Sequence, residues 1–329
     1  MAQQRARVVI VSPASSRENN GNWQTASRWA RFLRTAYQAD IASEWRGGAA
    51  PDLLVALHAR RSAASLAAFA QAWPDRPTLL VLTGTDLYRD IDRCAEAQAA
   101  LAQASALVLL QPAGLARLPA ALQAKAQVIY QSAPALQPRP PSPARRHLDI
   151  GMVGHLRAEK DPLTFIRAAQ LATDPRLRFV HIGGALDPAL GAAALQAQAA
   201  NPRYRWLGAL PHAAARQRLK RCHAMAIASH MEGGANVIIE AVTSGVPVLA
   251  SDISGNRGML GDDYAGYFAP GDAAALARLA ERSVADPAFD ALLRRQCAAR
   301  AALFAPAAER AALLDLVDNL LLRRGAHLT

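Results

Sequence analysis

Cysteine is scarce in this sequence: its three cysteines, Cys94, Cys222 and Cys297, lie far apart. An odd number at this spacing argues against a disulfide framework and against a zinc site of the C-x-x-C type. Long apolar runs are missing as well. No stretch approaches the ~20 residues of a membrane span, and the N-terminal run Val8–Val11 is too short for a signal peptide. The sequence favours a protein of the reducing cytoplasm without a membrane partner.

Lysine is also rare, because only three of the 37 basic residues are lysines. The formal net charge of +11 favours anionic partners such as nucleic acid, membrane headgroups or phosphorylated small molecules. The arginines are scattered along the chain, and no block of five or more basic residues occurs. We therefore expect no nucleic-acid partner.

Two common catalytic motifs are absent. The sequence has no G-x-S-x-G elbow and no G-x-x-x-x-G-K-[ST] loop, which argues against a serine hydrolase and a P-loop nucleotidase. We expect no metal, because four histidines lack metal-ligand spacing with carboxylates: His181, His212, His223 and His230.

The first half of the chain alternates apolar strands with helical segments. Short runs rich in β-branched residues are typical of buried parallel strands, and five occur: Arg7–Ser12, Asp52–His58, Thr78–Thr83, Ala106–Leu110 and Gln127–Tyr130. Helices are predicted over Trp23–Tyr37 and Ser62–Ala72. This alternation indicates a doubly wound parallel sheet.

A second α/β segment follows a proline-rich stretch, Pro134–Pro143, that we interpret as a linker. The predicted strands are Leu148–Val153, Arg178–Ile182, Tyr204–Leu207, Ala224–Ala228 and Val246–Ala250. The predicted helices are Pro162–Ala172, Ala213–Arg221, Asn236–Ser244, Asp272–Ala285, Pro287–Leu303 and Ala307–Arg324.

The length of 329 residues exceeds what one hydrophobic core usually serves. We expect two Rossmann-like domains facing a cleft, over residues 1–133 and 147–305, with a linker at 134–146. A C-terminal helix in 306–329 is expected to return to the first domain. Ligands of open parallel sheets bind beyond the carboxyl ends of the strands, so the chemistry is expected on the loops there.

The most specific motif runs from Glu232 to Glu240 and follows a predicted strand. Gly233 and Gly234 leave backbone amides open at a helix start, where phosphate binds through free N–H groups and the helix dipole. Acidic side chains beside a phosphate suit the hydroxyls of a sugar or ribose. The alternative is a glycine-rich turn, a helix cap and a solvent-facing Glu240. Glu240 lies among apolar residues, however, and a buried carboxylate without a partner is costly.

A second motif, Gly151–Pro162, also lies between a strand and a helix. It places Arg157 and Lys160 three residues apart, and two cations there can neutralise a diphosphate leaving group. The alternative is a pair of surface cations.

In order and spacing, these two motifs resemble the retaining, family-4 glycosyltransferases of the GT-B fold, with their E-x7-E motif and upstream G-R-L-x-x-x-K stretch. Glu232, Glu240 and Lys160 match that pattern, whereas His155 stands where the family usually has Arg. The resemblance covers most of the second domain. It implies catalytic roles for Glu232, Lys160 and Arg157, and donor binding by Gly154, His155, Gly233, Gly234, Asn236 and Glu240.

Three stretches of the first domain resemble one branch, the selenosugar synthases of selenoneine biosynthesis. They are Asn19–Thr25 after Ser12-Pro13, Ala56–Ser62 and Leu82–Tyr88. This resemblance implies transfer of a sugar from a UDP-sugar to selenophosphate, with no further cofactor. It places the anionic acceptor on strand-end residues: Asn20, Gly21, Asn22, His58, Arg60, Arg61, Ser62, Thr83, Thr85 and Asp86.

Each of these residues has a structural alternative. Gly21 can form a turn, Asn and Thr can cap helices, the arginines can be solvated, and His58 can be a core histidine. For the whole chain, two other functions stay open. One is a glycosyltransferase with a hydroxyl acceptor, and the other is a basic, non-catalytic protein that binds nucleic acid or anionic surfaces, with salt-dependent affinity.

Overall fold

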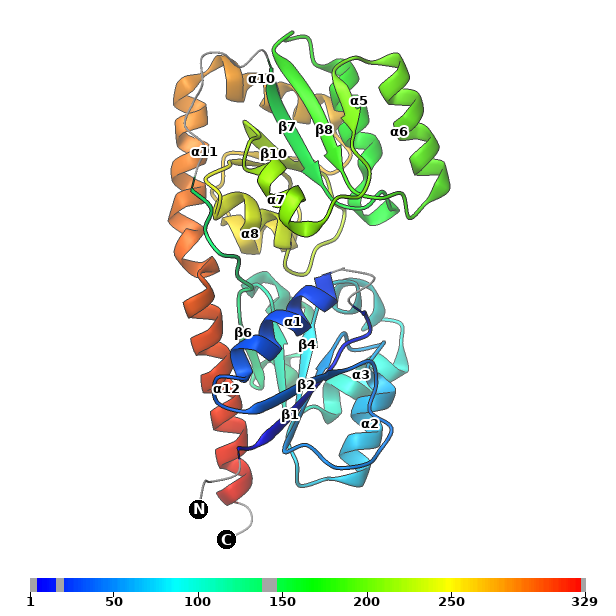
Figure 1. The fold of residues 1–329 in the computed structure, drawn as a ribbon, viewed down its shortest axis with the longest axis vertical. Helices are drawn as coiled ribbons and strands as arrows, with labels where there is room; N and C mark the ends of the chain where they lie inside the picture. The colour runs from blue at the N-terminus through cyan, green and yellow to red at the C-terminus, as the bar shows by residue number, and fades with distance from the viewer. Residues whose placement is uncertain (1–4, 16–20, 138–146, 327–329) are drawn as a thin grey trace. The chain divides into compact units, whose positions relative to one another are not determined.

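The computed structural model describes residues 5–15, 21–137 and 147–326 (Figure 1). The chain divides into two compact units. Unit 1 comprises Met1–Ser132 together with Pro306–Thr329, and unit 2 comprises Ala133–Ala305. Of the expected linker, residues 138–146 lie outside the described residues, and residues 134–137 have no regular secondary structure.

The described residues of unit 1 form a six-stranded parallel sheet with the order β2-β1-β3-β4-β5-β6. Its strands are β1 (Arg7–Val11), β2 (Gln38–Ala42), β3 (Leu53–Leu57), β4 (Thr78–Leu82), β5 (Ala106–Leu109) and β6 (Ala126–Val128). The strand order reverses between β1 and β3. In open sheets such a switch point opens a crevice beyond the strand ends, here at the loops after β1 and β3.

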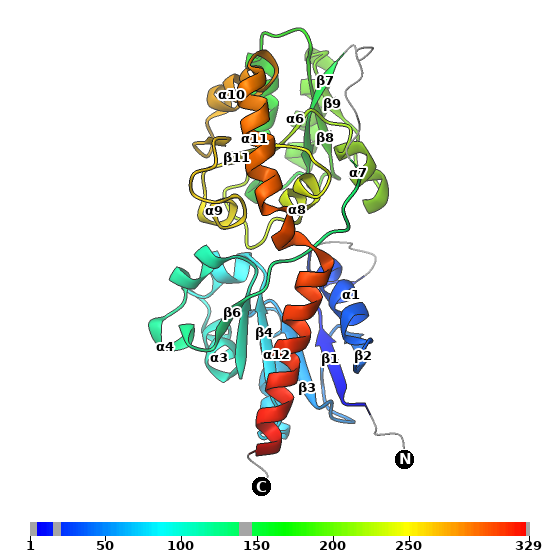
Figure 2. The ribbon, with the colours of Figure 1, turned by 90° about the vertical axis from the view of Figure 1, so that its left-hand side faces the viewer.

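Both faces of this sheet are covered by helices, because side chains alternate along each strand. Val8, Ile10 and Val55 pack with α1 (Gly21–Leu33) and α12 (Pro306–Ala326). Figure 2 shows α12 running along this sheet. Ala56 and Leu80 face the other way, toward the side covered by α2 (Ala63–Ala72) and α3 (Ala95–Gln103). Shorter turns complete unit 1: the π turn η1 (Asp86–Asp90), η2 (Pro112–Arg117) and α4 (Ala120–Gln123).

Glu309 in the first turn of α12 ties this helix to α1. Its carboxylate is 1% exposed and accepts hydrogen bonds from Arg28 (Nε, 2.7 Å; Nη2, 3.0 Å) and from the Trp29 indole at 2.7 Å. The Ser132 hydroxyl donates to it at 2.5 Å. A buried carboxylate is tolerated only with such partners, so Glu309 fixes where α12 packs.

Unit 2 contains a second parallel sheet, six-stranded over the described residues, with the order β12-β11-β10-β7-β8-β9. Its strands are β7 (Leu148–Val153), β8 (Leu177–Ile182), β9 (Tyr204–Trp206), β10 (Ala224–Ile227), β11 (Val248–Ser251) and β12 (Tyr267–Phe268). This is the strand order of the Rossmann fold, and its switch point lies between β7 and β10.

The helices of unit 2 cover both faces of its sheet. Phe179 of β8 packs edge-on against Phe165 of α5 (Pro162–Leu171), whereas the adjacent Val180 clusters with Ala215 of α7 (His212–Leu219) on the opposite face. The helical segments are η3 (Ala158–Lys160), α5 (Pro162–Leu171), α6 (Pro188–Ala200), α7 (His212–Leu219), α8 (Asn236–Val242), α9 (Ser254–Leu260), α10 (Ala273–Ala285), α11 (Pro287–Arg300) and η4 (Ala301–Phe304).

Three of these helices begin with the dipeptide Asp-Pro. Asp161, Asp187 and Asp286 cap α5, α6 and α11 by accepting backbone N–H bonds, and the following proline supplies the first helical residue. The first backbone N–H groups of a helix have no partner within the helix. The aspartate side chain accepts hydrogen bonds from them, and the proline has no N–H group that would need a partner. Across the described residues, no helix combines the length and apolar character needed to span a membrane.

Candidate active site

In unit 2, Lys160 and Glu232 meet at the switch point of the sheet. Lys160 ends η3 after β7, Glu232 follows β10, and their Nζ and Oε1 atoms lie 2.5 Å apart. The two side chains are only 15% and 10% exposed. A partly desolvated ion pair of this kind is held more firmly than a surface pair. The structure therefore brings together the lysine and the first acid of the sequence motifs.

A chain of buried hydroxyl and amide groups supports Glu232. The Ser229 hydroxyl donates to Glu232 Oε1 at 2.6 Å, and the Ser251 hydroxyl donates to the Ser229 carbonyl at 2.6 Å. Asn256 of α9 donates to the Ser251 carbonyl at 2.8 Å. Gly255 brings α9 so close that a Cβ atom there would lie 2.0 Å from the Glu232 carbonyl. Sequence reasoning did not find Ser229 or Asn256, whose signal is their position in the segments that follow β10 and β11.

His181 of β8 orients the loop after β7. Burial lowers the pKa of His181 to about 4, so the ring is neutral at pH 7. Its Nε2 lies 3.2 Å from the Gly154 carbonyl, which can only accept, so the proton is on Nε2. Nδ1 then accepts from the Tyr204 hydroxyl at 3.1 Å. His181 is thus a structural group that fixes the backbone at Gly154.

His155 is held by the neighbouring loop. Its Nδ1 accepts the Gly184 N–H at 3.1 Å, which leaves the proton of the neutral ring on Nε2. Gly183 has a φ of +156°, and a Cβ there would lie 1.9 Å from the Gly154 carbonyl. Arg157 is exposed and forms no ion pair with any described residue, so the structure does not join it to the Lys160–Glu232 pair.

The second acid of the motif, Glu240, lies on α8 and has a histidine partner. Its side chain is 10% exposed, and His212 of α7 donates from Nε2 to its Oε1 at 2.6 Å. Burial lowers the pKa of Arg216, one turn further along α7, and Glu240 acts in the opposite direction. The buried carboxylate is therefore compensated by two residues that the sequence motif does not contain. Gly233 and Gly234 lie in the bend before α8, and Asn236 is its first residue.

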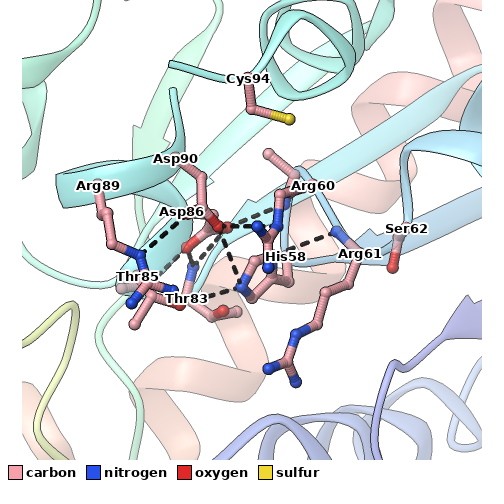
Figure 3. A network of polar contacts seen from close by, with 12 residues as sticks. His58, Arg60, Arg61, Ser62, Thr83, Thr85, Asp86, Arg89, Asp90 and Cys94 are labelled. Carbon is pink, nitrogen blue, oxygen red and sulfur yellow. Dashed lines mark hydrogen bonds and ion pairs between the residues drawn. The ribbon is translucent and has the colours of Figure 1, made fainter. Parts of the chain in front are cut away.

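In unit 1, His58 follows β3 in a strained backbone conformation with a φ of 73° (Figure 3). Strain of this kind often marks functional positions. Its Nδ1 accepts the Arg61 N–H at 3.4 Å, and its Nε2 lies 3.1 Å from the Thr85 hydroxyl oxygen. Burial lowers the pKa of His58, against the opposite effect of Asp86. The neutral ring therefore donates from Nε2 toward Thr85.

Two of the expected acceptor residues organise the backbone. Asp86 is fully buried and accepts N–H bonds from Ala59 (2.9 Å), Thr83 (3.0 Å) and Gly84 (2.7 Å). Ser62 is buried and donates to the Leu57 carbonyl at 2.6 Å. Asp86 thereby joins the loops that follow β3 and β4, and its oxygens are engaged by backbone donors.

A second carboxylate, Asp90, lies next to two arginines and His58 at the same place (Figure 3). Its Oδ2 lies 3.3 Å from Arg60 Nε and 4.0 Å from His58 Nε2, and its Oδ1 accepts from Arg89 Nε at 3.1 Å. Arg61 is exposed. Sequence reasoning missed Asp90 and Arg89, which follow Asp86 within η1.

The loop after β1 is described only in part. Gly21 and Asn22 open α1, and Asn20 lies outside the described residues. The expected acceptor residues that the structure does bring together are those after β3 and β4, from His58 to Asp86.

Solved structures of other proteins share this architecture. The fold matches Anabaena HepE in complex with UDP and glucose, with a TM-score of 0.73 and 17% identity over 95% of this chain and 99% of that chain. It also matches sucrose-phosphate synthase from Thermosynechococcus elongatus, with a TM-score of 0.76 and 16% identity over 97% and 100% of the two chains. The expectation of a GT-B fold, with two parallel α/β sheets, is confirmed.

The amino-acid sequence identifies the family to which the chain belongs. Residues 139–303, half of the chain, match the sequence model of the family described as glycosyl transferases group 1. The chain belongs to the group 1 glycosyl transferases. The matched range contains Lys160, Glu232 and Glu240.

Proposed function

We propose that this glycosyltransferase transfers a sugar from a UDP-sugar to selenophosphate and so forms a 1-selenosugar. The observation that carries the proposal is the cluster after β3 and β4, where Arg60, Arg89 and His58 surround one buried carboxylate. Such a cluster suits a small, multiply charged anion better than a neutral sugar hydroxyl.

The donor half of the proposal rests on unit 2. The diphosphate would bind at Lys160 and Arg157, with the amides near Gly233 and Gly234, while Glu240 holds the ribose. Glu232 would bind hydroxyls of the transferred sugar. HepE, which shares this fold, has been solved with UDP-glucose. In our proposal Lys160 supplies the cation for the diphosphate, and Glu232, beside it in the ion pair, accepts hydrogen bonds from the hydroxyls of the transferred sugar.

The proposed reaction forms a bond between selenium and C1 of the sugar. The C1–O bond to the diphosphate breaks, and its electron pair leaves with UDP. Water then cleaves the P–Se bond, which releases phosphate and the selenosugar. Selenophosphate is already ionised, so the acceptor needs no general base, and the protein contributes orientation and stabilisation of the leaving group.

The direct test is UDP release by the purified protein under reducing conditions. UDP-glucose and UDP-N-acetylglucosamine are each supplied with and without selenophosphate, and the products are followed by mass spectrometry. We expect UDP release that requires selenophosphate and yields a selenium-bearing sugar. Donor binding without turnover would reject selenophosphate and favour a hydroxyl acceptor. Absence of donor binding, together with salt-dependent binding of polynucleotides, would favour the non-catalytic alternative.

A further inference from the structure

His230 contacts the chain on both sides of Lys160. It lies in the segment after β10, two residues before Glu232. Its backbone N–H donates to the carbonyl of Glu159 at 3.0 Å. Its ring Nε2 lies 3.4 Å from Oδ2 of Asp161. The lysine that pairs with Glu232 is therefore flanked by two residues that one histidine holds.

Asp161 has an unusual backbone conformation for a residue with a side chain. Its φ is 44° and its ψ is 60°, in the left-handed region. The following Pro162 disfavours the right-handed helical conformation at this position. Aspartate tolerates the left-handed region better than most residues, but such a conformation is strained and persists only where surrounding contacts maintain it. The contacts of Asp161 thus determine how the chain leaves Lys160.

The carboxylate of Asp161 is contacted from two segments. Its Oδ1 accepts the N–H of Thr164 at 3.2 Å, and its Oδ2 accepts the hydroxyl of the same residue at 2.5 Å. Thr164 belongs to α5, the helix that Asp161 caps, whereas His230 reaches Asp161 from the segment after β10. A carboxylate oxygen only accepts, so the ring presents its Nε2–H to it. The Asp161 side chain is 12% exposed, and this partial burial strengthens the contact.

The ammonium group of Lys160 depends on a well-defined backbone. A lysine side chain has four rotatable bonds and loses much conformational entropy when it is held in one position. Its stem lies beside Gly154, where a Cβ atom would be 3.7 Å from Cγ and Cδ of Lys160. Its Nζ meets Glu232 at the switch point of the sheet. A change in direction of the chain at Asp161 would move this ammonium group.

We propose that His230 is a positioning residue for Lys160. Through Asp161 it fixes the left-handed residue that follows the lysine, and so holds the ammonium group where the diphosphate of the donor binds. The proposal rests on the donor half of the proposed function, in which Lys160 binds the diphosphate. It is independent of the acceptor, because it holds equally for selenophosphate and for a hydroxyl compound.

The contact through Nε2 is tested by His230→Gln and His230→Asn. The amide nitrogen of glutamine can take the place of Nε2, whereas that of asparagine takes the place of Nδ1 and is too short to reach Asp161. Calorimetry of UDP binding to the full-length protein is the measurement. We expect His230→Asn and His230→Ala to weaken UDP binding about fivefold, and His230→Gln by less than about twofold. His147→Ala, at an exposed position in the same unit, is the control and should bind UDP like the unaltered protein.

A double-mutant cycle with Lys160→Ala separates positioning from a direct contact with the donor. Lys160→Ala should weaken UDP binding about tenfold or more, since a charge-assisted contact is lost. If His230 acts through Lys160, adding His230→Ala to Lys160→Ala changes the affinity by less than about twofold. Thermal unfolding of each variant is recorded alongside, because a role in folding alone would lower Tm without this dependence on Lys160.

The outcomes distinguish the positioning role from the proposed function. Equal UDP affinity in His230→Ala and His147→Ala overturns the positioning role even if Lys160→Ala loses affinity and the donor site stands. Additive losses in the cycle overturn it as well, because His230 would then contribute by itself. Unchanged UDP affinity in Lys160→Ala rejects the donor site at Lys160, and the positioning role with it.

Discussion

Lys160 and Glu232 form an ion pair of 2.5 Å although they are 72 positions apart in the sequence. The pair lies at the switch point of the second sheet, because Lys160 comes from the segment after β7 and Glu232 from the segment after β10. Each charge offsets the desolvation of the other. Donor binding at this place would replace part of that compensation with contacts to diphosphate and sugar.

The first prediction concerns Lys160. Lys160→Ala should lower kcat by about 10²–10³-fold, because the charge that develops on a departing diphosphate loses its cation. The control is Lys220→Ala, which removes a lysine at the end of α7. Steady-state UDP release measures both, and circular dichroism checks the fold. Unchanged turnover in Lys160→Ala would remove this residue from the catalytic site.

The second prediction concerns Glu240. Glu240→Gln should weaken UDP binding about tenfold, since the carboxylate that would hold two ribose hydroxyls becomes an amide. Calorimetry of UDP binding is the measurement. Asp262→Asn, with a side chain 85% exposed in the same unit, should bind UDP like the unaltered protein. If both variants bind UDP equally well, the ribose does not contact Glu240, and the His212–Glu240 pair is structural only.

The third prediction concerns the anchor of α12. Glu309→Gln leaves Arg28 beside a neutral group in a buried site, and breaking such a pair costs about 3–5 kcal/mol. Urea unfolding followed by tryptophan fluorescence reports on unit 1, which contains four of the five tryptophans. Glu44→Gln, in an exposed pair with Arg46, should change stability by less than about 1 kcal/mol. Similar unfolding curves for both variants would contradict the anchoring role.

The fourth prediction is a pH dependence caused by His181. Its pKa is about 4 in the folded protein and near 6.5 in the unfolded chain. Between these values the unfolded chain binds more protons, so the contribution of His181 is fully present above pH 6.5 and is lost as the pH falls toward 4. The loss amounts to about 3 kcal/mol. His181→Gln should show a smaller decrease in unfolding free energy between pH 7 and pH 5. His147→Gln, at an exposed position, is the control and should retain the full decrease.

Much of the fold could be predicted because its buried strands are short apolar runs. The predicted strand Leu148–Val153 coincides with β7, and the predicted Arg7–Ser12 overlaps β1. The strand β2 was not predicted, since it is an edge strand with exposed polar residues, Gln38 and Asp40. The helix α6 was also missed, because its alanine-rich sequence has little amphipathic periodicity.

The candidate site could be predicted only where residues adjoin strand ends. Lys160 and Glu232 lie in the segments that follow two neighbouring strands, β7 and β10, so the parallel sheet brings them to one edge. Which way a side chain points was not predictable: Asp86 turns inward to backbone donors, and Asp90 reaches the arginines through a π turn that no local pattern indicates. The partner of Glu240, His212, depends on how α7 packs beside α8 and has no signal in the motif.

The most direct test of the central claim is the bond formed at C1 of the sugar. UDP-glucose labelled with ¹³C at C1 is incubated with the protein and selenophosphate, and the product is examined by ¹³C and ⁷⁷Se NMR. The account predicts a one-bond coupling between C1 and selenium in a product that appears together with UDP. Released UDP with C1 bonded only to oxygen would contradict it, because the sugar would then have been transferred to water or to a hydroxyl group.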